Sequence, residues 1–164
     1  MKDRPRDEIW NYQQIELGLN YRMNDIQAAL GINQMKRIDK TISRRHEIAR
    51  KYDRELADLP LVTPWQAPNF YSSYHLYNIV IKNDSNNKSQ RQYYDELWER
   101  EIAINLHYIP VHRQPYYENL GFKIDDFPVA EQFHRETISI PMYASLKDED
   151  QDYVIENLKK VALE

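Results

Sequence analysis

The stretch GLNYRMNDIQAALGINQMKRIDKTISRRHEIARKYDREL, residues 18–56, decides the fold because its apolar residues recur every three to four positions. This spacing places them on one face of an α-helix, and the stripe continues from Met23 to Leu59. Asn24 and Asp25 suit the first turn of such a helix, and Pro60 ends it. We therefore expect one continuous helix of about ten turns. A small domain cannot cover so long a stripe, so we expect part of it to pack on something outside this chain.

Three short segments after this helix predict strands. HLYNIVI at 75–81 is rich in aromatic and β-branched residues, and the segments 102–108 and 137–141 resemble it. The first two flank a predicted helix, which indicates a βαβ-like unit.

Helices are predicted at 90–101, 128–135 and 148–161, the first capped by Ser89. The expected fold class is α/β, in the form of a small α+β domain. A long N-terminal helix is followed by a three- to four-stranded sheet packed with helices.

Composition excludes several classes of function. The 164 residues carry 22 Lys and Arg against 26 Asp and Glu, so we expect no nucleic-acid partner. The absence of cysteine excludes disulfides, thiolate metal sites and cysteine nucleophiles. No apolar run could span a bilayer, and the leader MKDRPRDE is too charged for a signal peptide, so we expect a cytoplasmic protein without membrane contact.

The numbers of glycine and tyrosine residues exclude further classes of function and favour others. The three glycines, Gly18, Gly31 and Gly121, stand too far apart for a dinucleotide or Walker-type phosphate loop. Tyrosine occurs 13 times, and its ring with a polar tip suits surfaces that meet a ligand or partner.

Asn20 and Arg22 lie two positions apart just before the long helix. In an extended segment both side chains face the same way, next to the positive end of the helix dipole. A carboxamide and a guanidinium in that place suit a phosphate or carboxylate. The alternative is that Asn20 makes a turn and Arg22 pairs with a surface acid.

NLHYIPVHRQPYY, residues 105–117, is the second candidate site. Tyr108 and His112 share parity, so in an extended chain they face the same way at the end of a strand. His107 and His112 match no metal-binding spacing, so no metal is predicted. The alternative is that these histidines only make structural hydrogen bonds.

Two acidic groups flank predicted helix starts and are interpreted as structural: Asp125 and Asp126, and Asp148, Glu149 and Asp150. No GxSxG elbow and no desolvated lysine is present, so no catalytic residue is predicted.

Four segments in order resemble one protein family: the opening stretch at 18–56, SSYHLYNIVI at 72–81, INLHYIPVHRQPYYENLGF at 104–122, and the run from 126 to 159. They are similar to the C-terminal portion of the DegT/DnrJ/StrS sugar aminotransferases. The branch that they resemble most is that of the pseudaminic acid pathway, which aminates C4 of a UDP-linked 4-keto-6-deoxy-N-acetylhexosamine.

The resemblance implies a homodimeric fold-type I enzyme that uses pyridoxal 5′-phosphate (PLP), with glutamate as the donor and a nucleotide sugar as the acceptor. Its large N-terminal domain would carry the Schiff-base lysine, which we cannot place here. We therefore expect a fragment that alone binds no PLP and does not transaminate. Residues 1–22 would be a leader and remnant of the large-domain boundary, and residues 23–164 the linker helix plus the small domain.

The resemblance also implies roles for individual residues. Asn20 would reach the PLP phosphate of the neighbouring subunit, and Arg22 would lie near it. Tyr108 and His112 would line the substrate pocket, with His107 and Tyr117 as further candidates. Two alternatives stay open: a freestanding tyrosine-rich domain that binds carbohydrate or protein without catalysis, and a relative that uses the same scaffold for dehydration.

Overall fold

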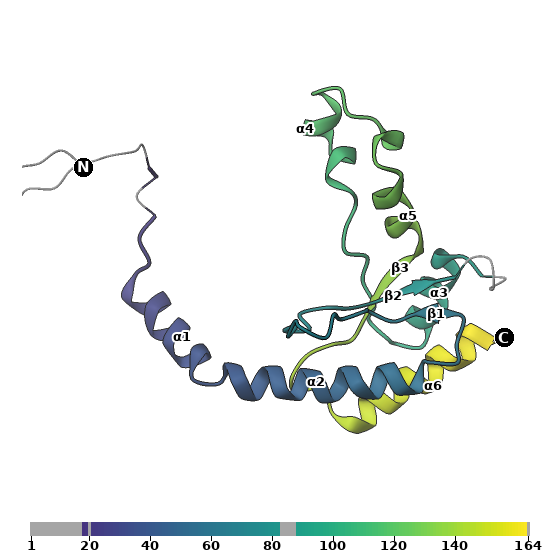
Figure 1. Cartoon of the computed structure of the whole chain (residues 1–164), viewed down its shortest axis with the longest axis horizontal. Coiled ribbons are helices and arrows are strands. Elements are labelled where there is room, and N and C mark those ends of the chain that lie inside the picture. Colours follow the sequence, from purple (N-terminus) through teal and green to yellow (C-terminus); the bar gives the residue numbers. More distant parts are fainter. Residues whose placement is uncertain (1–17, 20, 83–87, 164) are drawn as a thin grey trace, which may run out of the picture. The chain divides into compact units, whose positions relative to one another are not determined.

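The computed structural model describes residues 18, 19, 21–82 and 88–163. The chain divides into two compact units, with the boundary between Arg37 and Ile38. Figure 1 shows helix α1 in the first unit and the small sheet with its helices in the second. Among the described residues, none of the helices combines the length and the apolar character needed to cross a membrane.

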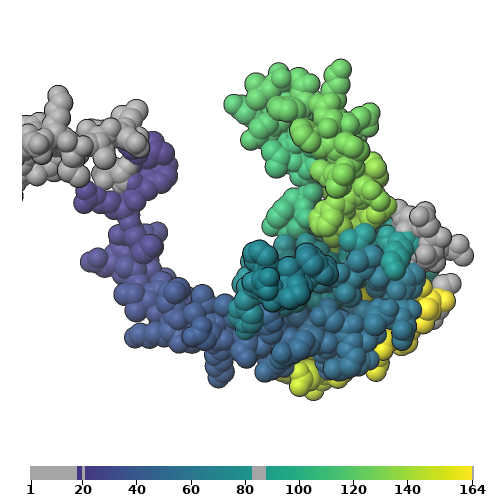
Figure 2. Space-filling model, in the orientation of Figure 1, coloured from purple at the N-terminus to yellow at the C-terminus, as the bar shows by residue number. Residues whose placement is uncertain are grey.

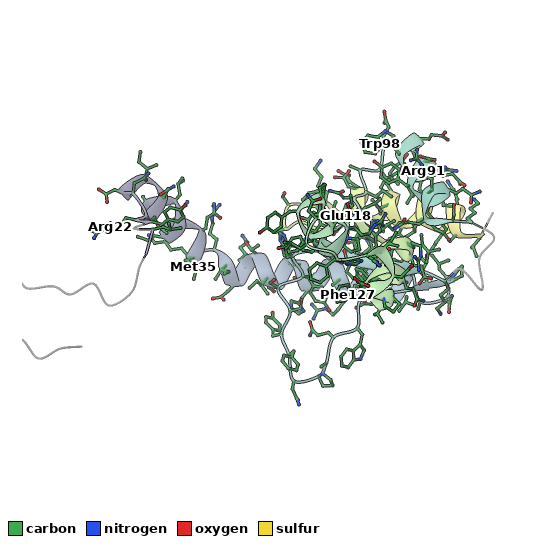
Figure 3. All side chains as sticks on the ribbon, turned by 90° about the horizontal axis from the view of Figure 1, so that it is seen from above. Arg22, Met35, Arg91, Trp98, Glu118 and Phe127 are labelled. Carbon is green, nitrogen blue, oxygen red and sulfur yellow. The ribbon has the colours of Figure 1, made fainter. Side chains whose placement is uncertain are left out.

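Helix α1, Asp25–Met35, begins with the predicted cap. The Asn24 side chain accepts a hydrogen bond from the Gln27 amide at 2.9 Å, and the Gln27 side chain accepts one from the Asn24 amide at 3.0 Å. This reciprocal pair satisfies two amides at the helix start. The helix buries none of its residues within this chain, and Met35 projects from the ribbon in Figure 3.

The prediction of one unbroken helix is wrong, because α1 is followed by a separate helix, α2, Ile38–Glu55. At the break the Arg37 amide donates to the Gln34 carbonyl at 3.0 Å, a three-residue bond that replaces the four-residue α-helical pattern. Neither proline nor glycine stands at Lys36 or Arg37, so the sequence carries no signal for this interruption.

The sheet has three antiparallel strands in the order β1-β2-β3. Strands β2, Tyr77–Ile81, and β3, Thr137–Ile140, confirm two predicted strands, whereas β1, Leu61–Val62, was missed. Asn78 stands opposite Ser139 in the register of β2 and β3.

The predicted strand at 102–108 is absent, and with it the βαβ-like unit. Only Asn105 forms an isolated bridge, to Ser139. Ile102 and Ile104 are buried, so their alternation with exposed residues reflects packing of an irregular segment on the core, not a strand in the sheet. The small mixed domain of helices and sheet is confirmed.

Helices α2, α3, Gln90–Glu99, and α6, Asp148–Leu163, surround the core. The predicted Ser89 cap of α3 is present, with its hydroxyl accepting from the Gln92 amide. Helices α2 and α6 lie side by side in Figure 1. The buried Gln151 side chain joins them by donating to the Ile48 carbonyl at 2.9 Å.

Residues 107–136 form a lobe that stands out from the sheet, drawn in green in Figure 2. It contains the short helices η2, Val111–Arg113, α4, Pro115–Glu118, and η3, Ile124–Asp126. Helix α5, Pro128–Glu136, confirms the helix predicted there and leads directly into β3. The lobe is therefore connected to the sheet at both of its ends.

Candidate ligand-binding groove

A groove of about 760 Å³ opens in this lobe between two segments. Residues 107–111 line one side, and residues 126–130 with Phe133 line the other. Most of these side chains are apolar, and His107 and Tyr108 bring hydrogen-bonding groups to one side of the groove. An apolar cleft with a few polar groups is the usual form of a small-molecule site.

Tyr108 is the most accessible of the predicted site residues in this lobe, with 73% of its surface exposed. The ring of His107 meets the ring of Tyr108 edge to face, with centroids 4.6 Å apart. Of the four residues that the sequence proposes for a ligand site in this lobe, His107 and Tyr108 line the groove.

His107 is held by a chain of hydrogen bonds that begins on the sheet. Its Nδ1 lies 2.7 Å from the Ser139 hydroxyl, which in turn donates to Asn78 Oδ1 at 2.6 Å. Sequence reasoning did not single out Ser139. The available signal was a hydroxyl in the apolar strand TISI, because a buried polar group requires a partner.

His112 does not line the groove with Tyr108. It is 7% exposed, and its Nε2 donates to Glu131 Oε1 at 2.8 Å while its ring packs on Phe127 at 4.9 Å. The expectation that His112 and Tyr108 face the same way fails because residues 111–113 form a 3₁₀ turn instead of extended chain. The contacts of His112 are instead structural, as in the alternative interpretation that these histidines only make structural hydrogen bonds.

Glu131 is the residue of this site that sequence reasoning missed. It is 2% exposed on α5, and besides His112 it faces Arg113 at 3.5 Å and Arg135 at 3.9 Å. A buried carboxylate requires such partners. The cluster fastens η2 to α5, so it fixes the two walls of the groove relative to each other.

Tyr117, the remaining candidate in this lobe, lies outside the groove lining. Its ring meets Tyr116 edge to face at 5.3 Å and Phe122 at 6.3 Å, and 37% of its surface is exposed. In this structure Tyr117 belongs to an aromatic cluster of the lobe.

The first unit contains the other predicted site. Arg22 lies at the start of α1, as Figure 3 shows. It lines an open hollow of about 730 Å³ together with Tyr21, Met23 and Gln27. Asn20 lies outside the described residues. Arg22 and the helix start favour an anion here, and Asp25 in the first turn partly offsets this charge.

Two of the acidic residues at helix starts, Asp126 and Asp148, make structural contacts, in agreement with their interpretation. Asp126 accepts from the Lys123 amide at 2.8 Å, and Asp148 accepts from Arg44 at 2.6 Å. The Arg44 guanidinium lowers the pKa of the Asp148 carboxyl below its usual range. Within the described part of the chain, no three His, Asp or Glu side chains are grouped so as to hold a metal ion.

Comparison with known proteins extends these observations. The family model described as the DegT/DnrJ/EryC1/StrS aminotransferase family matches residues 2–159. A UDP-4-amino-4,6-dideoxy-N-acetyl-β-L-altrosamine transaminase of Campylobacter jejuni is 30% identical over 154 residues, covering 93% of this chain and 40% of that protein. The chain thus spans about two fifths of the length of the curated relatives that it matches.

Among the solved structures that resemble this chain are sugar aminotransferases and related aminotransferases, and the chain again covers about two fifths of each. The Helicobacter pylori aminotransferase PseC, described as involved in pseudoaminic acid biosynthesis, has a TM-score of 0.81 at 27% identity, covering 99% of this chain and 42% of that chain. The sugar aminotransferase Spr1654 of Streptococcus pneumoniae in its PLP form has a TM-score of 0.81 at 31% identity, covering 93% of this chain and 39% of that chain. A PMP form of the same protein also matches. These likenesses confirm the resemblance noted from the sequence.

Proposed function

Because the chain belongs to the DegT/DnrJ/EryC1/StrS aminotransferase family, we propose that it is the C-terminal part of a PLP-dependent nucleotide-sugar aminotransferase. The match over residues 2–159 carries this proposal. The chain covers about two fifths of the length of these relatives, which supports a portion of a longer enzyme. The lack of cysteine is compatible with a cytoplasmic location.

We propose a UDP-linked 4-keto-6-deoxy-N-acetylhexosamine as the acceptor, aminated at C4, and glutamate as the donor. The names of the Campylobacter jejuni transaminase and of Helicobacter pylori PseC support this choice of sugar. The product would serve the synthesis of cell-surface polysaccharide or of nonulosonate sugars.

The residues of the first unit suit the phosphate of the cofactor. When bound, PLP supplies the electron sink that makes transamination possible. Arg22, at the start of α1, offers a guanidinium that binds phosphate oxygens, and Asn20 would assist it. We propose that both act on the cofactor site of the neighbouring subunit in a homodimer.

The groove of the second unit is proposed to hold part of the nucleotide sugar. Its apolar walls suit the face of a sugar ring or base, and Tyr108 and His107 provide hydrogen-bonding groups. The role of His112 in this proposal is to hold η2 through Glu131 instead of contacting the substrate. Tyr117 would support the same lobe through its aromatic contacts.

The test is a turnover assay on the full-length protein with PLP, glutamate and the UDP-4-keto sugar. We expect amination by the wild type. In Tyr108→Phe we expect KM for the sugar to rise about three- to tenfold, the value of one hydrogen bond. Tyr116→Phe, which removes an exposed hydroxyl outside the groove, should leave KM unchanged.

The half-reaction with glutamate alone separates the two ways in which this proposal fails. If glutamate converts the cofactor but the sugar is not aminated, the substrate assignment is wrong. If neither step occurs, transamination with glutamate as the donor is overturned.

A further inference from the structure

We propose that Ser139 and Asn78 are positioning residues that fix the tautomer of His107, so that its Nε2 faces the groove as a hydrogen-bond acceptor. The group that it accepts from would be a hydroxyl or amide N–H of the sugar, and this last step rests on the proposed function. Neither Ser139 nor Asn78 lines the groove.

The direction of each hydrogen bond follows from counting protons. The Ser139 hydroxyl has one proton, and it donates this proton to Asn78 Oδ1 at 2.6 Å. Toward His107 Nδ1, at 2.7 Å, the same oxygen can therefore only accept. His107 Nδ1 must carry a proton, which leaves Nε2 of the neutral ring unprotonated.

The backbone holds this arrangement rigidly. Asn78 and Ser139 are opposite one another in the register of β2 and β3. Asn105 and Ser139 exchange two backbone hydrogen bonds, of 3.1 and 2.8 Å, two residues before His107. Both the side chain and the backbone near His107 are thus fixed to the sheet, which is what a precisely oriented ligand contact requires.

The free edge of the imidazole is available to a ligand. His107 lines the groove, and among the described residues its Nε2 has no hydrogen-bond partner. His112, five residues later, is held in the opposite way, because its Nε2 donates to Glu131. Of the two histidines, His107 therefore presents an acceptor to the groove, and His112 is engaged inside the lobe.

Two-bond ¹H–¹⁵N NMR of the 164-residue chain measures the tautomer directly, at about pH 8, where an ordinary histidine is neutral. The wild type should show His107 protonated on Nδ1, with His107→Gln identifying the signals. In Ser139→Ala, and in the milder Asn78→Ala, the ring should populate both tautomers. Asn78→Asp, which keeps the acceptor oxygen, should restore the wild-type spectrum.

Thr137→Val is the matched control, because Thr137 lies on the same strand and its buried hydroxyl has no hydrogen-bond partner among the described residues. It should leave the His107 tautomer unchanged. A wild-type ring protonated on Nε2, or an unchanged tautomer in both Ser139→Ala and Asn78→Ala, would overturn the inference.

Kinetics of the full-length enzyme test the contact with the sugar. Ser139→Ala should raise KM for the nucleotide sugar about three- to tenfold and leave the glutamate half-reaction unchanged, whereas Thr137→Val should alter neither. An altered tautomer with an unchanged KM refutes the sugar contact alone. Absence of turnover in the wild type refutes the proposed function and, with it, the sugar contact, but not the tautomer assignment.

Discussion

Glu131 is a carboxylate buried in α5, and its three partners lie on two different elements. Replacing it by glutamine keeps its shape but removes the charge that faces His112, Arg113 and Arg135. Because the two arginines are partly solvated, we expect Glu131→Gln to lower the free energy of unfolding by about 2 kcal/mol.

Urea unfolding of the chain measures this change. The control is Glu156→Gln, an exposed carboxylate on α6, for which we expect a change within about 0.5 kcal/mol. Equal stability of the two variants would show that the Glu131 cluster does not fasten the lobe.

Tyr77 gives the chain a sensitivity to alkaline pH. Burial, and then the hydrogen bond that it donates to Asp53, raise the pKa of Tyr77 above its ordinary value. As the pH rises, Tyr77 therefore ionises in the unfolded chain before it ionises in the folded chain. The stability that neutral Tyr77 gives the fold is complete below about pH 10 and is lost as the pH rises further.

Stability measured from pH 7 to pH 11 tests this interpretation. Tyr77→Phe should cost about 1 kcal/mol at pH 7 and should show a shallower alkaline decline than the wild type. Some decline should persist, because burial also raises the pKa of Tyr52. Tyr21→Phe, at an exposed ring, should follow the wild type; an equally steep decline in Tyr77→Phe would contradict the account.

Among the elements, α1 and α6 differ in what covers their apolar residues. Leu158 of α6 is fully buried in the core, whereas Leu30 of α1 is 61% exposed. The same change to alanine should therefore cost about 3 kcal/mol at Leu158 and within about 0.5 kcal/mol at Leu30. Denaturant unfolding of both variants at low protein concentration measures the difference, and a comparable loss at Leu30 would show that its side chain is covered in solution.

Helix positions were predictable from sequence because caps and periodicity are local. Ser89 and Asn24 each cap the helix that follows them, as expected. The break after Met35 carries no local signal, and the apolar alternation at 102–104 serves packing without strand pairing. Whether residues 102–104 form a strand, and whether the sheet is antiparallel, depends on pairing between segments far apart in the sequence.

In the candidate site too, residues close together in the sequence were easier to predict than contacts between distant residues. Tyr108 and His107 were both proposed from the sequence and line the groove, but the pairing that the sequence suggested, Tyr108 with His112, is not formed. Glu131 and Ser139 were not predicted, because their partners lie 19 and 32 residues away along the chain. Contacts of that range depend on how the lobe folds back onto the sheet, which residue spacing does not reveal.

At the scale of the whole molecule, we propose that this chain supplies phosphate-binding and substrate-binding side chains, and that the Schiff-base lysine belongs to the remainder of a longer enzyme. The apolar face of α1, including Ile26 and Leu30, is exposed within the chain, as expected of a segment that packs on other parts of a longer enzyme. The isolated chain should consequently associate with itself.

The most direct test is the visible absorption spectrum after incubation with PLP and dialysis, recorded for the full-length protein and for the 164-residue chain. We expect the band of lysine-bound PLP in the full-length protein and none in the chain. A stoichiometric band on the chain alone would contradict this expectation, because the chain would then contain the lysine assigned to the remainder of the enzyme.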